Sequence, residues 1–491
     1  MGINNLFNIA ASGINAQRLA IEVTSENIAN VNTQGYSRQR TIFETAPTTL
    51  ANGFPLGTGV KLAAVQRSYD GLLQQQIVNG NSTYGKNSTL NSALQQVEPS
   101  FNEVIANGLG QSFEDFFDSW HDLSVNPQGT AERQAVLARS QVLVDNFHRL
   151  NASLDNVISN ADNTLVGITN DISDKAKNIA SLNYQIKMTE QLGGNANELR
   201  DQRDYLLQEL GTKVGITADE QADGTVTVKL PLNAGGGGET LVSGNQYALV
   251  YTSVNGGTGL NDIRISSVGN PPATAGGDAD VTATIGGPND VTKAADNSLG
   301  EIGGTLQTRD TIVGGAEGYL ARLDEMANQL ATTVNAQHTA GFDLAGVAGV
   351  NFFNGATSAA ITLNIADADT IAAAGAVGGV GDNVNALAMA DLKIDDTIIF
   401  TVGATVTTST FGGYYNSFVS SIGIDVQSAK NATQQSESFL KQLNSLRESK
   451  SGVSLDEELT NLVKYQRAFE ASARLVNSAT DMMDTLINLV R

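Results

Sequence analysis

The sequence ends in SGVSLDEELTNLVKYQRAFEASARLVNSATDMMDTLINLVR, residues 451–491, and this stretch has the repeat of a coiled-coil helix. Apolar residues recur every seven positions from Leu455, and a second row begins four residues later. The first row is Leu455, Leu462, Phe469, Val476, Met483 and Val490; the second is Leu459, Gln466, Ala473, Thr480 and Ile487. Such spacing predicts a helix that buries one side against another helix. Ser454 and Glu457 have the spacing of a capping box, so we expect the helix to begin at Leu455.

The beginning of the chain carries a matching repeat. Its large apolar row is Phe7, Ile14, Ile21 and Ile28, and its companion row is Ile3, Ala10, Gln17, Thr24 and Val31. Gly35 can adopt the left-handed conformation that often closes a helix, so we expect the first helix to stop near it. We therefore predict that the two terminal helices pair as a coiled coil, with residues 1–35 and 453–491 forming one domain.

The middle of the chain predicts an elongated helical bundle. Apolar residues alternate in steps of four and three from Phe147 to Ile186, which indicates one long helix in need of partners. Partner stripes occur at 319–334, at 418–429 and at Phe439, Leu443 and Leu446. Four aromatic side chains, Phe113, Phe116, Phe117 and Trp120, share one helical face and are expected in the core. The bundle is assigned to residues 36–211 and 304–452.

Three segments break the helical period. Residues 38–65 hold Pro47, Pro55 and several Gly, which indicates an extended link with short strands. Residues 224–230 alternate apolar and polar, so 212–303 is predicted as a small outer β domain. Residues 346–412 mix Ala-Gly stretches with strand-like runs and are expected to form a β-containing excursion on the bundle. The predicted fold class is mainly α with inserted β.

Composition limits the classes of function that the chain can have. A net charge of −22 over 491 residues argues against nucleic acid or an anionic membrane as a partner. We find no secretory signal and no apolar run of membrane-spanning length. Cys is absent, and His338 with Asp343 lacks the spacing of a metal site, so a turn-stabilising role is favoured. We expect no catalytic site, no cofactor and no metal.

The residues after the first helix resemble a known signature. The segment from Asn27 to Arg38, NIANVNTQGYSR, is similar to that of bacterial flagellar rod, hook and hook-associated proteins, and 459–489 resembles the end of that axial family. Segments 116–147, 199–210 and 335–353 resemble the hook-associated protein 1 family more narrowly. The resemblance spans roughly 350 residues and is weak between about 212 and 300. The motif positions are Asn27, Asn30, Asn32, Thr33, Gly35 and Tyr36.

This resemblance implies a structural component of the hook-filament junction that self-assembles through its terminal helices. The partners it implies are a ring of copies of the same chain, the hook protein, the second hook-associated protein and an export chaperone bound to the C-terminal helix. The location it implies is extracellular, after export through the flagellar type III apparatus. Another axial protein, either the hook or the second hook-associated protein, is an alternative of the same class. A secreted helical effector or adhesin is an alternative of another class.

Overall fold

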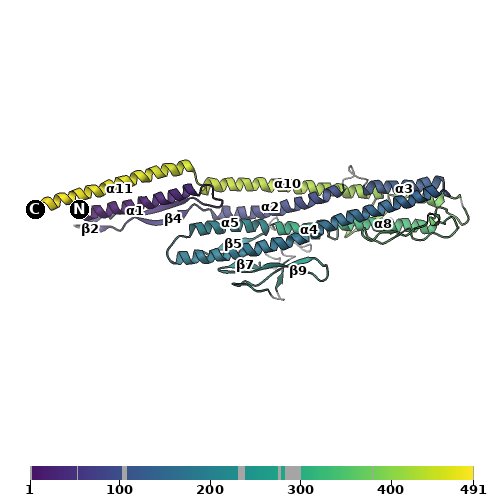
Figure 1. The fold of residues 1–491 in the computed structure, drawn as a ribbon, viewed down its shortest axis with the longest axis horizontal. Coiled ribbons are helices and arrows are strands. Elements are labelled where there is room, and N and C mark those ends of the chain that lie inside the picture. Colours follow the sequence, from purple (N-terminus) through teal and green to yellow (C-terminus); the bar gives the residue numbers. More distant parts are fainter. Residues whose placement is uncertain are drawn as a thin grey trace.

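The computed structural model describes residues 3–51, 54–101, 108–230, 238–274, 278–281, 300–379 and 381–489. They form a long, narrow molecule in which both chain ends lie at the same tip (Figure 1). Helices span its length, and small sheets lie beside them. This architecture confirms the predicted fold class, mainly α with inserted β.

The narrow tip is built from the first and last helices, α1 (Ile3–Ala29) and α11 (Leu455–Leu489), which run antiparallel (Figure 1). A hairpin of β1 (Gln39–Thr45) and β4 (Val60–Arg67) packs on α1. The short pair β2 (Thr49–Ala51) and β3 (Phe54–Leu56) lies between them in the chain. The predicted link with short strands is thus confirmed, but it accompanies the terminal helices, whereas the sequence placed residues from 36 onward in the bundle.

Helix α1 ends at Ala29, six residues before the predicted stop at Gly35. The Asn30 side chain donates to the Glu26 carbonyl at 3.1 Å, and the Thr33 hydroxyl donates to Asn30 Oδ1 at 3.0 Å. These side chains offer the backbone turns in place of further helix. Gly35, with φ of 86°, then supplies the left-handed residue that directs the chain into β1.

The body has α4 as its longest element, with 62 residues. Its helices are α2 (Gly71–Val97), α3 (Leu109–Val125), α4 (Thr130–Gln191), α5 (Asn197–Lys213), α7 (Gly300–Gln307), α8 (Tyr319–Ala340) and α10 (Phe411–Ser451). A 3-10 turn, η1 (Glu98–Phe101), follows α2, and a π-helical turn, η2 (Thr308–Val313), follows α7. Helix α4 packs on α3 and α8 and also on α5 and α7. Segments from both halves of the sequence therefore build one bundle.

Helix α10 runs antiparallel to α2 and links the body to α11. Leu443 is buried with Leu73 and Ile77 of α2. Phe439 and Leu446 are 51% and 45% exposed, so the predicted stripe is wrong at these two positions. The reason is that α2 covers only the side of α10 that contains Leu443, and the other two residues lie on the flank.

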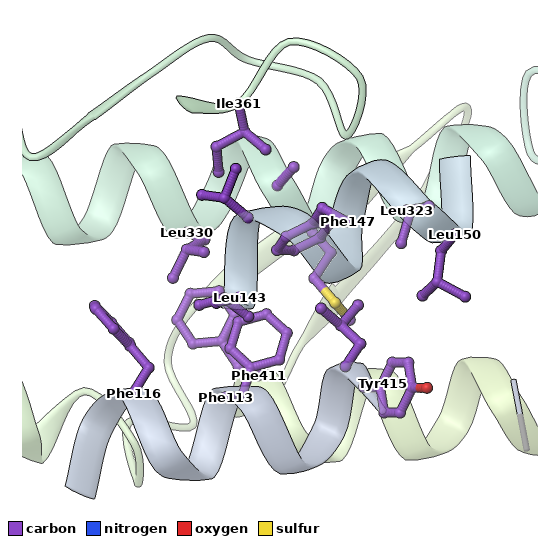
Figure 2. Close-up of a cluster of buried hydrophobic side chains, with 14 of the residues drawn as sticks. Phe113, Phe116, Leu143, Phe147, Leu150, Leu323, Leu330, Ile361, Phe411 and Tyr415 are labelled. Carbon is purple, nitrogen blue, oxygen red and sulfur yellow. The ribbon is translucent and has the colours of Figure 1, made fainter. Parts of the chain in front are cut away.

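The end of the bundle away from the termini holds an aromatic core (Figure 2). Phe116 and Trp120 of α3 are completely buried. The ring of Phe113 stacks on Phe411 of α10 at 5.3 Å between centroids and meets Phe147 of α4 edge-on at 5.8 Å. These contacts confirm the prediction that the aromatic face of α3 is core.

Two small sheets lie along α4. One has the order β5-β6-β7-β8 and the other β11-β10-β9, and Tyr247 of β8 forms a bridge with Gly269 in the segment that follows β10. The strands are β5 (Thr217–Glu220), β6 (Val226–Lys229), β7 (Thr240–Ser243), β8 (Gln246–Tyr247), β9 (Val250–Val254), β10 (Asn261–Ile265) and β11 (Ala279–Asp280). Their inner side chains form one core with Ile172 and Ile179 of α4. Within the described residues, the β region is therefore a layer that shares its core with the bundle, and α7 begins at Gly300, before the predicted boundary at 304.

The excursion of residues 346–412 wraps around the aromatic core. It contains β12 (Phe353–Asn354), β13 (Thr362–Leu363), the 3-10 turn η3 (Ala368–Thr370), α9 (Val384–Asp391), β14 (Ile399–Val402) and β15 (Thr405–Thr408). Arg133 is buried and holds the excursion to α4 by donating to the carbonyls of Ala368 and Ile371 at 3.1 and 2.7 Å. Backbone carbonyls thus compensate the charge of the buried Arg133 guanidinium.

His338 is buried at the end of α8 and fastens the same excursion. Its Nδ1 lies 2.6 Å from the Val350 carbonyl, and its Nε2 accepts the Ala372 N–H at 3.0 Å. Only the neutral ring with a proton on Nδ1 satisfies both contacts, and burial lowers the pKa of His338 accordingly. Asp343 accepts from the N–H groups of Ala345 and Val347 in its own turn. The turn-stabilising interpretation of His338 is therefore confirmed.

Candidate assembly site

The two terminal helices approach closely because small residues lie between them. A Cβ added to Gly13 of α1 would come within 3.0 Å of Ser472 Oγ in α11. Ala10 and Ala20 of α1 are buried on the same side of that helix, and Ala479 of α11 is completely buried. Side chains of this size let two helix backbones pack tightly.

The buried side of α11 matches the first predicted row and contradicts the second. Leu462, Phe469, Val476 and Met483 are partly buried. Leu459 and Ile487 of the second row are about half exposed, as is Leu455 at the start of the first. The inner companion row instead lies three residues beyond the first and comprises Tyr465, Ser472 and Ala479. The error has a geometric cause: from residue 462 onward, a step of three turns the side chain toward α1, and a step of four turns it outward. Val490 lies outside the described residues.

On α1, the small and polar row faces α11. Ala10, Thr24 and Asn27 are buried, whereas Ile14, Ile21 and Ile28 are only partly buried and Phe7 is 42% exposed. The large apolar row lies on the flank of the contact, on the side of α1 that the β1–β4 hairpin leaves free. The termini thus pair as predicted, but their largest side chains are not fully used by the pair.

Asn27, the first motif residue, joins α1, β1 and α11. It is completely buried. Its Oδ1 accepts from the Gln39 N–H and the Tyr36 hydroxyl, both at 2.9 Å. Its Nδ2 donates to the Gln39 carbonyl at 2.8 Å and to Glu458 Oε2 at 3.1 Å. Both ends of the amide are saturated, which requires Asn at this position because a carboxylate could not donate.

Glu458, 2% exposed, is the partner of this amide on α11. Its carboxylate also accepts from Arg38 Nε at 2.8 Å, and Arg38 Nη1 donates to Glu457 at 2.7 Å. Helix α11 begins at Leu455 as predicted, and Glu457 is paired with Arg38. A buried carboxylate is stable here because a guanidinium and an amide compensate it.

The remaining motif residues shape the turn between α1 and β1. Tyr36 N–H donates to the Thr33 carbonyl at 3.2 Å, and burial raises the pKa of the Tyr36 hydroxyl, which keeps it a donor. A Cβ on Gly35 would come within 3.1 Å of Tyr205 Cβ in α5. Asn32, by contrast, is exposed. The motif therefore sets the path from the terminal helix to the body.

A buried ion cluster anchors this turn and the hairpin to α5. Asp201 accepts the Ser37 N–H at 2.8 Å, and Arg67 of β4 donates to Asp201 at 2.8 Å and to Asp204 at 2.6 Å. Burial raises the pKa of both Asp carboxyl groups, and Arg67 counteracts it. Because breaking a buried pair leaves an uncompensated charge, this cluster fixes the hairpin to the body.

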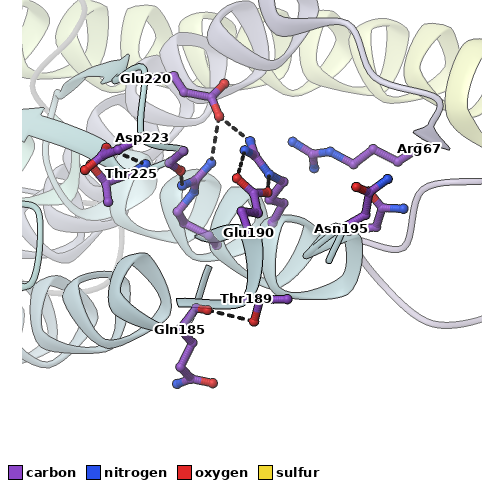
Figure 3. A network of polar contacts seen from close by, with 12 residues as sticks. Arg67, Gln185, Thr189, Glu190, Asn195, Glu220, Asp223 and Thr225 are labelled. Atoms are coloured by element: carbon purple, nitrogen blue, oxygen red, sulfur yellow. Dashed lines mark hydrogen bonds and ion pairs between the residues drawn. The ribbon is translucent and has the colours of Figure 1, made fainter. Parts of the chain in front are cut away.

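Figure 3 shows the polar network that continues from this anchor. Arg200 of α5 forms two bonds to Glu190 of α4, at 2.7 and 2.9 Å, and also contacts Glu220 of β5. Asn195, in the loop between α4 and α5, donates to the Val65 carbonyl of β4 at 2.6 Å. The tip, the bundle and the β layer are thus joined around the start of α5.

Two acidic side chains meet beside the turn. The carboxyl groups of Glu26 in α1 and Glu198 in α5 share a hydrogen bond, which together with burial raises the pKa of Glu26 to about 7. They border a cavity of about 410 Å³ that Asn30, Gly35 and Tyr205 also line. The contact between α1 and α5 therefore holds a proton near neutral pH.

Within the described residues, no three His, Asp or Glu side chains lie close enough together to hold a metal ion. The helices that the structure describes include none with the length and apolar character of a membrane span. The groups that the structure does concentrate are apolar rows on two paired helices and a rigid polar junction behind them.

Comparison with known proteins identifies the family. The model described as "Flagellar hook-associated protein FlgK helical domain" matches residues 94–353. Flagellar hook-associated protein 1 of Bacillus subtilis (strain 168) is 30% identical, covering 98% of this chain and 97% of that protein. The chain belongs to the flagellar hook-associated protein 1 family. Members of this family are structural components of the flagellum, and this chain is one at the hook-filament junction.

Other relatives agree with this family assignment. Flagellar hook-associated protein 1 of Escherichia coli (strain K12) is 27% identical over 99% of this chain and the whole of that protein. The solved structure of the flagellar hook junction protein FlgK from Burkholderia pseudomallei shares the fold, with a TM-score of 0.66 at 15% identity, covering 77% of this chain and 100% of that chain. Two models of flagellar rod proteins match only residues 7–36 and 447–489. The two ends are thus similar to flagellar rod proteins as well, and the helical-domain model of the hook-associated protein family matches the body.

Sequence reasoning missed three residues of this site. Gly13 and Ser472 escaped notice because a heptad search looks for large apolar side chains. An acid at Glu458 suits the first turn of any helix, so the sequence alone does not show that it is the buried partner of Asn27. A sequence signal exists only for the first two, as small residues spaced along the helix faces. The third depends on a contact across 431 positions.

Proposed function

We propose that α1 and α11 are the assembly site of this hook-filament junction subunit. In this proposal the two helices pack with neighbouring copies of the chain in a ring, with the hook protein and with the second hook-associated protein. The observation that supports it is the incomplete burial of the large apolar rows: Ile14, Ile21 and Ile28 of α1 and Phe469 of α11 are only partly covered by their own chain. Such rows gain apolar burial when another helix covers them.

Other exposed side chains of α11 support the same proposal. Several large apolar side chains of this helix are between 43% and 55% exposed. They are Leu455, Leu459, Val463, Leu475, Met482, Leu486 and Ile487. Leu455, Leu459 and Ile487, expected in the seam between the termini, would thus contact neighbouring subunits. An exposed surface of this kind marks a protein interaction site.

The same surface would need cover before assembly, so we propose that an export chaperone binds α11 and that the chain leaves the cell through the flagellar type III apparatus. We also propose that the chain has no catalytic activity. The buried charged groups described here, Arg67, Asp201 and Glu458 among them, are paired inside the protein and hold elements together. None of them lines a site where a substrate would meet them unpaired.

Electron microscopy of cells that lack this protein tests the proposed place in the flagellum. We expect hooks without filaments and filament subunits released into the medium, with both defects restored by the intact gene. Filaments of normal number and attachment in the deletion strain would contradict the proposal. Relatives that match nearly the whole chain are hook-associated protein 1 proteins, which favours this proposal over the hook and second hook-associated protein alternatives.

A further inference from the structure

The hairpin of β14 and β15 has one covered edge and one open edge. The register pairs Phe400 with Thr407 and Val402 with Thr405, and Ser409 N–H donates to the Ile398 carbonyl. In an antiparallel pair with this bonding, the backbone groups of the alternate residues point away from the partner strand. On β14 the outward N–H of Thr401 donates to Glu325 of α8 at 2.8 Å.

On β15 the corresponding outward residues are Val406 and Thr408. Within the described part of the chain, no partner is seen for their N–H groups, and all four residues of β15 are exposed. Proteins normally protect an open edge with charged residues, proline or a covering element. Here the edge is the uncharged run Thr405–Thr408.

A cavity of about 380 Å³ lies between this strand and the start of α10. Thr405 and Thr407 of β15 line one side, and Tyr414 and Phe418 of α10 line the other. The Tyr414 ring stacks on Phe400 of β14 at 4.0 Å between centroids and forms an aromatic wall. The volume is in the range of pockets that hold a bound group.

The charges around the cavity are already occupied. Glu317 accepts the Ala404 N–H at 3.0 Å, and Arg322 donates to the Glu317 carbonyl and to Ser421 Oγ. Residues 397–424 contain no charged side chain, although the chain has 80 charged residues, 29 basic plus 51 acidic, and a net charge of −22. An uncharged occupant matches this surface. Another acidic protein can also approach this surface without charge repulsion.

We propose that β15 is a docking edge for an extended, uncharged segment of a neighbouring flagellar axial subunit, which adds a strand beside Val406 and Thr408 and inserts an apolar side chain into the cavity. The strand is specified by the backbone, because outward N–H and C=O groups spaced two residues apart match another extended chain. The cavity, which lies beside the open edge, specifies the apolar side chain. This inference rests on the proposed function, since it takes the neighbour from the assembled junction.

Photocrosslinking in assembled flagella tests the proposal. A benzoylphenylalanine is placed at Val406, with Ile399 as the matched control, because both are exposed apolar residues of one hairpin and Ile399 lies on β14. We expect a crosslink from position 406 to an extended segment of another axial subunit, identified by peptide mass spectrometry, and at least about tenfold less from 399. A chain that is incorporated but gives no crosslink to another subunit from 406 overturns the docking edge alone. If the unsubstituted chain is itself absent from purified flagella, the proposed function is overturned instead.

A proline variant provides the second measurement. Val406→Pro removes only an outward N–H, so the hairpin bonds of Thr405 and Thr407 remain, and prolines are tolerated at strand edges. We expect the purified variant to keep the wild-type circular dichroism and to lose at least about tenfold in junction incorporation when it competes with the wild type. Ile399→Lys should incorporate normally. Equal incorporation of Val406→Pro and wild type would overturn the proposal.

Discussion

The aromatic end of the bundle and the tip made by α1 and α11 differ in how far they bury their large apolar side chains. At the bundle end, Phe116, Trp120 and Phe147 are completely buried by their own chain. At the tip, small residues occupy the closest contact and large ones such as Phe7 and Phe469 remain at least partly open. The bundle end buries its apolar side chains within one chain, whereas those of the tip are fully buried only when other chains cover them.

This difference in burial decides whether each region is stable in the free protein. Fixing one residue costs about 1–2 kcal/mol of backbone entropy, so a long helix must bury a wide apolar face to be stable. Helix α11 has 35 residues but covers its large side chains only in part. We therefore expect the bundle to be folded in the free protein and the terminal pair to be ordered by assembly, as in coupled folding and binding.

The largest expected effect is a loss of incorporation caused by a change in the tip that leaves the body folded. Phe469→Asp places a charge in the half-covered seam, and we expect incorporation into the flagellum to be abolished, because a charge there opposes the apolar burial that assembly provides. Ile21→Asp on α1 should do the same. Incorporation is measured by immunoblotting of purified flagella.

Ser478→Asp is the matched control for this change, because Ser478 is exposed on the same helix and lies in neither apolar row. It should incorporate normally. The thermal unfolding of the body should be unchanged in all three variants. Normal incorporation of Phe469→Asp would contradict the assignment of the seam.

The next largest effect is a loss of stability in the body. Phe116→Ala removes a completely buried ring, and we expect it to cost about 3–5 kcal/mol in the free energy of unfolding, measured with denaturant. Phe439→Ala, at a half-exposed position, should stay within about 0.5 kcal/mol of the wild type. Equal losses in the two variants would show that the bundle end is not the closed core described here.

A smaller effect tests the junction between the two regions. Asn27→Ala leaves the Gln39 N–H, the Tyr36 hydroxyl and Glu458 without their partner, and we expect a local cost of about 2 kcal/mol. Exchange of the Gln39 amide should then be about 30-fold faster in the assembled protein. Asn32→Ala, in the exposed part of the motif, is the control and should leave that amide unchanged. Slow exchange in Asn27→Ala would show that the turn is held by other contacts.

Sequence reasoning succeeded where a pattern repeats and failed where a contact depends on the other end of the chain. The row with Phe469 and the aromatic face of α3 were predictable because burial imposes a period. The outward position of Leu459 was not, because the side of α11 that meets α1 depends on how Gly13 fits Ser472. The role of Asn27 could be taken only from resemblance, since its partner Glu458 is 431 residues away. The β layer could be predicted as a separate domain because its strand period does not reveal that α4 side chains such as Ile172 and Ile179 share its core.

The smallest expected effect is a pH dependence at the same junction. The pKa of Glu26 is raised to about 7, so between about pH 4.5 and 7 the folded protein binds a proton that the unfolded chain releases. The contact with Glu198 is therefore strongest at acidic pH and weakens as the pH rises to about 7. In assembled flagella, where α1 is ordered, Glu26→Gln should flatten this part of the pH dependence of thermal unfolding, and Glu22→Gln, whose side chain pairs with Arg18, should not. Identical profiles for wild type and Glu26→Gln would contradict the shared proton.

Hydrogen exchange of the free protein and of the assembled flagellum is the most direct test of the contrast between tip and body. We expect amides of the bundle, α4 among them, to be protected in both samples. We expect amides of residues 3–29 and 455–489 to exchange rapidly in the free protein and to become protected on assembly. Strong protection of both terminal helices in the free protein, without any partner, would contradict the claim that neighbouring subunits complete them.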